Sequence, residues 1–105
     1  MLKVFISQPM NGLSDEEILE ARNTAIDEAK KILGDDIEIL DSYFDDYDPE
    51  AEGFDETVIP IKYLAKSIDI LAEADVVYFV KGFRNNRGCQ IEYNVANSYG
   101  KKILR

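Results

Sequence analysis

The sequence predicts an α/β domain with a four-stranded parallel sheet and helices on both of its faces. Short apolar runs alternate with segments of helical periodicity, in the order strand, helix, strand, helix, strand, helix, strand. Connections of this kind are right-handed and return to the same sheet, so the order favours parallel strands. With 105 residues, 46% of them hydrophobic, residues 1–105 are expected to form a single domain.

The first half of the chain begins with LKVFIS at 2–7, a short apolar run that predicts a buried strand. SDEE at 14–17 is a capping box with acids in the first helical turn, and helical spacing continues to Gly34. IEIL at 37–40 predicts the second strand. Residues 41–58 carry eight acids among Pro, Gly and aromatic residues, which predicts a long loop.

In the second half, a helix is predicted to begin near Pro60, because proline is favoured in the first helical turn. Apolar residues follow it at helical spacing. The remaining predicted elements are a strand at 76–80, a loop at 82–88, a helix at 88–99 and a strand at 101–105.

This connectivity leads us to expect a flavodoxin-like strand order of 2-1-3-4 and a Rossmann-like three-layer sandwich. In such sheets, ligands bind beyond the carboxyl ends of the strands, at the point where the strand order reverses. Here that point lies between the first and third strands, which lead into SQPMNG at 7–12 and KGFRNNRG at 81–88. We therefore expect a binding site between these two loops.

The net charge of -9 argues against binding to nucleic acids or anionic membranes, because both require a basic surface. No apolar run is long enough to cross a membrane, and the first residues lack a signal peptide pattern, so a cytoplasmic location is expected. The charge is uneven, with a net -13 in residues 1–58 and +4 in residues 59–105. Lys81, Arg84 and Arg87 favour a small anionic ligand.

The chain has no histidine and one cysteine, Cys89. This excludes an internal disulfide, the usual zinc ligand sets and histidine-dependent catalytic triads. The acids at 46, 48 and 50 lack the glycine and glutamate of a calcium loop. We expect no metal and no cofactor, and acid-base chemistry must depend on Asp, Glu, Tyr or Lys. Cys89 is expected to be a small core residue.

Glu92 stands in the middle of the apolar stripe of the helix at 88–99. Carboxylates are rarely buried unless they are paired. One interpretation is a nucleophile or base beside a ligand in a partly desolvated crevice. The other is a side chain whose stem packs on the core while its carboxylate pairs with Arg22, Lys102 or another base. The expected position beside the switch point favours the first.

The two loops offer further polar groups. The first provides three polar side chains and a glycine backbone ahead of a helix N-terminus, namely Ser7, Gln8, Asn11 and Gly12. It matches neither a dinucleotide-binding GxGxxG motif nor a phosphate-binding GxxxxGK[ST] motif, and an ordinary strand-to-helix turn is the alternative. Arg84 and Arg87 either hold a phosphate or carboxylate through their planar guanidinium groups, or are two solvated arginines.

Three blocks, FISQPMNG, SIDILAEADVVYFVKGF and NRGCQIEYNVANSYGKKI, resemble small bacterial and phage proteins of unknown function in the nucleoside 2-deoxyribosyltransferase-like superfamily. The corresponding family patterns are YISGPMTG, D-I-x-x-L-x-x-A-D-x-V-x-x-L-P-G-W and S-R-G-A-x-x-E-x-x-x-A-x-x-L-G. The resemblance covers nearly the whole chain and is weakest at 41–58. The three blocks in this order indicate the superfamily more specifically than they indicate any one activity within it.

In the characterised relatives, deoxyribosyltransferases and deoxynucleoside-monophosphate N-hydrolases, a helix glutamate attacks the anomeric carbon and forms a covalent glycosyl-enzyme. By motif position that residue is Glu92. The resemblance thus implies N-glycosidic cleavage or deoxyribosyl transfer on a nucleoside or nucleotide. Asp41, at the end of the second strand, is a candidate acid for the leaving base. The expected substrate contacts are Ser7, Gln8, Pro9, Met10, Asn11, Gly12, Ser67, Gly82, Phe83, Arg84, Asn86, Arg87 and Gly88.

The sequence also departs from the family pattern. Ser67 replaces a sugar-binding aspartate of the relatives, and Gln8 and Phe83 replace the common Gly and Trp. A serine can hydrogen-bond a hydroxyl group but carries no charge. A non-catalytic nucleotide-binding module and a small accessory protein acting through its acidic face are therefore the alternatives. Because the relatives pair their subunits around the site, a homodimer or higher homo-oligomer is expected.

Overall fold

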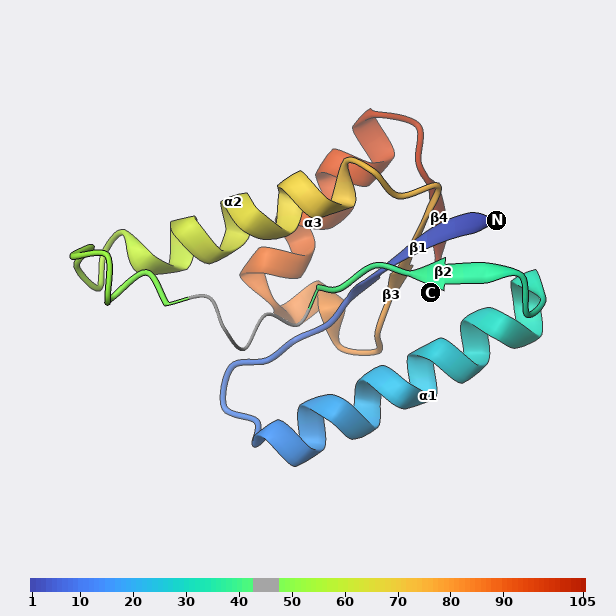
Figure 1. The fold of residues 1–105 in the computed structure, drawn as a ribbon, viewed down its shortest axis with the longest axis horizontal. Helices are drawn as coiled ribbons and strands as arrows, with labels where there is room; N and C mark the ends of the chain where they lie inside the picture. The colour runs from blue at the N-terminus through green and yellow to red at the C-terminus, as the bar shows by residue number, and fades with distance from the viewer. Residues whose placement is uncertain (43–47) are drawn as a thin grey trace.

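The computed structural model describes residues 1–42 and 48–105, in which a four-stranded parallel sheet is flanked by helices (Figure 1). The strands are β1 (Leu2–Ser7), β2 (Ile37–Ile39), β3 (Val76–Phe79) and β4 (Lys102–Leu104). The helices are α1 (Asp15–Leu33), α2 (Ile59–Leu71), α3 (Arg87–Ser98) and the 3-10 turn η1 (Phe83–Asn85). The strand order is β2-β1-β3-β4. The predicted α/β class and the 2-1-3-4 order are confirmed.

The helices cover both faces of the sheet, as predicted. α1 lies on one face, while α2 and α3 lie together on the other (Figure 1). Right-handed crossovers require this arrangement, because the step from β1 to β2 runs in the opposite direction to the later steps. Alternate residues of β1 therefore enter different layers: Val4 and Ile6 pack beneath α1, and Phe5 packs with residues of α2 and α3.

The register of the central strands sets the position of the two loops that follow them. Ser7, the last residue of β1, is paired with Phe79, the last residue of β3. The pairing continues one step further, since the backbone N–H of Val80 donates to the carbonyl of Ser7 at 2.9 Å. The loops after β1 and β3 consequently begin side by side at the carboxyl edge of the sheet.

The helix α1 begins as its sequence predicts. The Ser14 hydroxyl accepts from the backbone N–H of Glu17, and the Glu17 carboxylate accepts from the backbone N–H of Ser14, both at 3.1 Å. This is a complete capping box. Ala25 and Ala29 are buried against the strands, so the helix axis can lie close to the sheet.

The segment after β3 differs from the prediction of a loop over 82–88. Gly82 adopts a left-handed conformation, with φ of 94°, and the next three residues form η1. Phe83 is buried against Phe79 and Tyr93, with ring centroids 5.0 and 5.6 Å away, so an aromatic cluster draws the segment inward. The strands β2 and β4 are also shorter than predicted.

The helix α2 lies largely at the surface. Leu71, its last residue, is its one buried side chain, whereas Ile61 near its start is 65% exposed. In Figure 1 the N-terminal half of α2 and the turns before it project beyond the sheet. Across residues 1–42 and 48–105, no helix combines the length and apolar character needed to span a bilayer.

Candidate functional site

A cleft with a volume of about 900 Å³ opens where β1 ends, between the first half of α2 and the first half of α3. This is the edge of the sheet at which the sequence predicts a site. Its volume lies in the range that holds small organic ligands. The polar residues that line it are Gln8, Asn11, Ser42, Glu56, Thr57, Tyr63, Ser67, Asn86, Arg87 and Glu92. We refer to it as the Glu92 cleft.

Glu92 is buried, with 6% of its surface exposed, and faces the end of β1 from the second turn of α3. Its Oε1 accepts a hydrogen bond of 2.7 Å from the Ser7 hydroxyl. A second hydroxyl, that of Ser67 on α2, lies close enough to stabilise the same carboxylate. Glu92 makes no ion pair with any residue that the structure describes. The interpretation in which Arg22 or Lys102 neutralises this carboxylate is therefore wrong.

Burial controls the protonation of Glu92. Removal from water raises the pKa of its carboxyl group to about 7, while the hydroxyls of Ser7 and Ser67 act in the opposite direction by stabilising the carboxylate. Both protonation states are therefore populated near neutral pH. A carboxyl group of this kind can attack carbon or accept a proton when ionised, and can donate a proton when neutral.

Cys89 lies one turn before Glu92 on the same face of α3 and belongs to the hydrophobic core, as predicted. Burial raises the pKa of its thiol to about 11, so the thiol stays protonated at neutral pH. Its backbone N–H donates to the Asn86 side chain at 2.9 Å, which caps α3. Asn86 thus has a structural role in starting the helix that carries Glu92.

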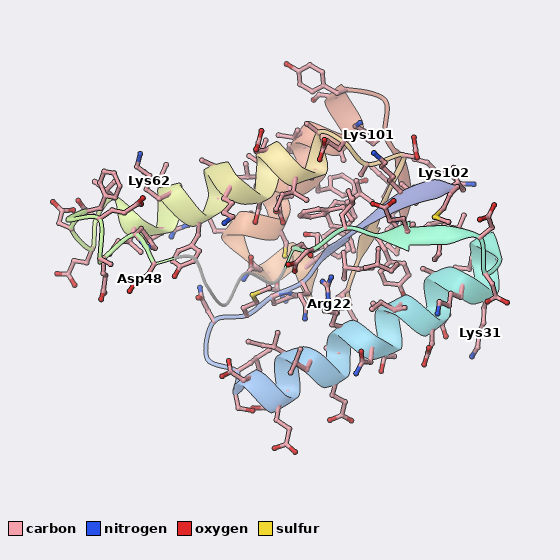
Figure 2. All side chains as sticks on the ribbon, in the orientation of Figure 1. Arg22, Lys31, Asp48, Lys62, Lys101 and Lys102 are labelled. Atoms are coloured by element: carbon pink, nitrogen blue, oxygen red, sulfur yellow. The ribbon has the colours of Figure 1, made fainter. Side chains whose placement is uncertain are left out.

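Arg22 joins α1 to the ends of two strands instead of pairing with Glu92. Its Nη1 donates to the Ser42 hydroxyl at 2.9 Å and its Nη2 to the Leu40 carbonyl at 3.0 Å. The Ser42 hydroxyl in turn donates to the Ile6 carbonyl at 2.9 Å. Figure 2 shows Arg22 reaching from α1 toward the strands. Burial lowers the pKa of the Arg22 guanidinium, and the charge of Asp41 acts in the opposite direction.

The structure brings several of the sequence-predicted residues together. Seven of them line the cleft with Glu92, namely Gln8, Met10, Asn11, Ser67, Asn86, Arg87 and Gly88. Ser7 lies behind the Glu92 carboxylate and is almost fully buried. The cleft therefore brings together three segments that are far apart in the sequence. These are the residues after β1, the start of α3 and one residue of α2.

Other predicted contact residues lie outside the cleft lining. Phe83 is buried in the core, and the Arg84 guanidinium lies over its ring, 5.0 Å from the centroid. Gly82 packs near Pro9, and Gly12 is exposed with a φ of 79° that starts the turn into α1. The predicted loop at 41–58 falls partly on residues 43–47, which lie outside the described residues.

Asp41, the candidate acid, is exposed and does not line the Glu92 cleft. Its effect on Arg22 puts it near that guanidinium. The next residue, Ser42, is buried and lines the cleft instead. Burial alternates along this stretch, since Leu40 and Ser42 are buried and Asp41 between them is exposed. The position of Ser42 just beyond the second strand was the signal that sequence reasoning missed.

The apolar wall of the cleft was also missed, because helical spacing alone does not show that an apolar side chain faces a cleft. It comes from the first half of α2 and from the exposed side of α3, and includes Ile59, Pro60, Ile61, Leu64 and Ile91, with Tyr63 beside them. Ile59 and Leu64 are partly buried and the other four are exposed, so the wall offers contact surface to a ligand.

A smaller hollow of about 470 Å³ lies on the opposite face of the sheet, between α1 and β3. Glu17, Glu20 and Lys81 lie around it, without a buried carboxylate in its lining. For metal binding, the described part of the chain places no three cysteine or carboxylate side chains together. The Glu92 cleft is therefore the candidate site.

Residues 2–105 match a family model described as a domain of unknown function, DUF4406. No curated protein and no solved structure shows significant similarity to the chain.

Proposed function

The chain belongs to the DUF4406 family of domains of unknown function, and from its cleft we propose that it cleaves or transfers at the N-glycosidic bond of a nucleoside or nucleotide. Glu92 acts as the nucleophile. The observation that carries this proposal is a buried carboxylate, held by Ser7 and without an ion-pair partner among the described residues, at the wall of a ligand-sized cleft.

The proposed chemistry requires little besides the carboxylate. A Glu92 oxygen forms a bond to the anomeric carbon while the bond from that carbon to the base nitrogen breaks, and the bonding electrons leave with the base. Water or a second base then attacks the same carbon and releases Glu92. A carboxylate that is poorly solvated gains most when positive charge develops on the sugar beside it.

The sequence resemblance to the nucleoside 2-deoxyribosyltransferase-like superfamily supports this choice, since it puts Glu92 at the position of the glutamate nucleophile. The hydroxyl of Ser67 near Glu92 suits a contact with a sugar hydroxyl. The partly exposed wall of Ile59, Leu64 and Ile91 suits the flat face of a base. Arg87 at the start of α3 suits an anionic group such as a phosphate.

The leaving base needs a proton donor within the cleft. Asp41 was predicted for this role but lies outside the cleft lining. Glu56, in the turns before α2, is a second carboxylate that lines the cleft, and it is exposed. We assign the role to Glu56 in preference to Asp41, because a proton donor must come within hydrogen-bond reach of the leaving group.

A non-catalytic nucleotide-binding module is the second candidate, and Ser67 is the observation that favours it. The characterised relatives carry an aspartate at this position, whereas the hydroxyl of Ser67 has no charge. A cleft with an intact Glu92 and a weaker sugar contact can hold a nucleotide without turning it over. A homodimer is expected whether the protein is an enzyme or a binding module, because a second copy would extend the walls of the cleft.

A screen for released base separates the two candidates. Purified protein is incubated with the common nucleosides and their monophosphates, and free base is measured by mass spectrometry. The proposal predicts release by the native protein and none by Glu92→Gln. Glu73→Gln, which changes an exposed acid after α2, is the matched control and should behave as the native protein does. Binding without release of base from any substrate would select the binding module.

A further inference from the structure

Gln8 is a cleft residue whose hydrogen bonding is incomplete. It follows Ser7 directly, lines the Glu92 cleft and exposes only 6% of its surface. Its Nε2 donates to the carbonyl of Ile18 in α1 at 3.0 Å. No described residue donates to its Oε1, although this oxygen is shielded from solvent. Buried acceptors without a donor are uncommon in folded proteins, so this one calls for an explanation.

The bond to Ile18 fixes the direction in which the Gln8 amide faces. Turning the amide over would bring Oε1 against the Ile18 carbonyl oxygen, and two acceptors repel each other. The group left without a partner is therefore an acceptor. It can be satisfied only by an N–H or an O–H.

The fold itself has little need of Gln8. Ile18 lies in the first turn of α1, and a carbonyl at that position accepts a helical hydrogen bond from the residue four positions later, Arg22. The Gln8 amide is therefore an additional donor to an oxygen that the helix already satisfies. An apolar side chain of similar length would fill the same space without leaving a buried oxygen unpaired.

We propose that Gln8 Oε1 accepts a hydrogen bond from the bound ligand, so that Gln8 selects ligands that carry a donor at this end of the cleft. This inference rests on the proposed function and specifies its substrate: the group facing Gln8 is a hydroxyl or an amino group. A phosphate or carbonyl oxygen is disfavoured there, because it would meet a second acceptor. The anionic part of a ligand then belongs beside Arg87, which also lines the cleft.

The donor reaches Oε1 through a rearrangement of side chains in the cleft wall, as commonly accompanies binding. Met10, two residues further on, also lines the cleft and is only partly buried. Its unbranched side chain can change rotamer readily. Gln8 thus determines which ligands bind, whereas Glu92 remains the nucleophile.

The test compares the protein that retains Gln8 with the Gln8→Met variant. Methionine is similar in length to glutamine but has no hydrogen-bond donor and no acceptor of comparable strength. Binding is measured by calorimetry in a Glu92→Gln background, so that turnover does not interfere. The probes are adenosine against purine riboside, cytidine against 2-pyrimidinone riboside, and adenosine against its 2′-, 3′- and 5′-deoxy forms. In the protein that retains Gln8, removing one particular amino or hydroxyl group from the nucleoside should weaken its binding about tenfold. In Gln8→Met the same loss should change affinity less than twofold.

A second measurement needs no ligand. Because a buried unpaired acceptor lowers stability, Gln8→Met should melt at or above the Tm of the native protein. Glu73→Gln, which changes an exposed residue outside the cleft lining, is the matched control for both measurements and should alter neither Tm nor probe preference.

The outcomes separate this inference from the proposed function. If the two proteins show the same affinity ratio for every pair of probes, the role given to Gln8 in ligand selection is overturned. A Tm several degrees lower in Gln8→Met would show that Gln8 is structural. Base release by the native protein together with equal preferences overturns the inference alone. A selective preference without base release supports it and overturns catalysis. Absence of binding to every probe overturns both.

Discussion

The hydroxyl of Ser7 donates a 2.7 Å hydrogen bond to the carboxylate of Glu92, which lies 85 residues later in the chain. Ser7 ends β1 and Glu92 faces it from α3, so the bond crosses from the sheet to the helix layer. Glu92 remains buried without an ion-pair partner among the described residues because this hydroxyl, together with that of Ser67, replaces part of its hydration. One carboxylate oxygen is thereby held, which fixes the orientation of the other.

Replacing Ser7 with alanine should raise the pKa of Glu92 further, because the hydroxyl stabilises the charged form and burial is then left unopposed by it. Ser67→Ala should act in the same direction but less strongly, since its hydroxyl has the smaller effect. The carboxyl carbon of Glu92, observed by NMR during a pH titration, reports this midpoint. A midpoint in Ser7→Ala that equals or falls below that of the native protein would contradict the role given to Ser7.

The raised pKa of Glu92 makes stability depend on pH. Its folded pKa is about 7 and its ordinary value is 4.5, so between these values the folded chain binds more protons than the unfolded chain. The stabilisation linked to the protonated form is therefore fully present below pH 4.5 and is lost as pH rises through 7. The loss is about 3 kcal/mol, since one pKa unit corresponds to about 1.4 kcal/mol.

Urea unfolding of the native protein and of Glu92→Gln between pH 4.5 and 8 measures this contribution. The free energy of unfolding of the native protein should fall relative to that of the variant across this range, because glutamine has no proton to lose. Curves that stay parallel from pH 4.5 to 8 would mean that Glu92 titrates at an ordinary pKa.

Arg87 and Arg84 are expected to differ in their effect on anionic ligands. Arg87 lines the Glu92 cleft, whereas Arg84 lies over Phe83 outside it. Arg87→Ala should weaken binding of a nucleoside monophosphate several-fold and reduce the salt dependence of that binding. Arg84→Ala serves as the matched control and should change little. Equal calorimetric affinities for a nucleoside and its monophosphate would rule out an anion contact by either arginine.

Self-association is expected through the exposed apolar side chains of α2 and α3. Ile61, Tyr63 and Ile91 lie at the surface near the cleft mouth, where a second copy of the chain would cover them. Sedimentation should show a dimer or a multiple of dimers, and Ile61→Asp should shift the distribution toward monomer. A native protein that sediments as a monomer at tens of micromolar, roughly where weak association becomes visible, would remove this expectation.

The strand order and the edge of the sheet that carries the cleft were predictable from the sequence. Apolar runs and helical spacing identify the elements, and the right-handed crossover rule then orders the strands. The burial of Glu92 was predictable too, because its position in the helical repeat assigns it to the inner face of α3.

The partners of these side chains were not predictable, because spacing assigns a residue to a face but does not determine what lies opposite. Arg22 was a candidate partner of Glu92, yet it bonds to Ser42 and to the Leu40 carbonyl. Phe83 was expected to touch the ligand, but the nearby rings of Phe79 and Tyr93 bury it in the core. Each of these contacts joins elements that only the folded chain brings together.

The most direct test of the central claim is the mass of the protein after incubation with a slow, fluorinated deoxyribosyl substrate. If Glu92 is the nucleophile, the native protein should gain the mass of one sugar unit, carried on Glu92, and Glu92→Gln should gain none, since an amide keeps the shape of the side chain but cannot attack carbon. Cleavage of nucleosides by Glu92→Gln at the native rate, or an equal mass gain in the variant, would contradict the account.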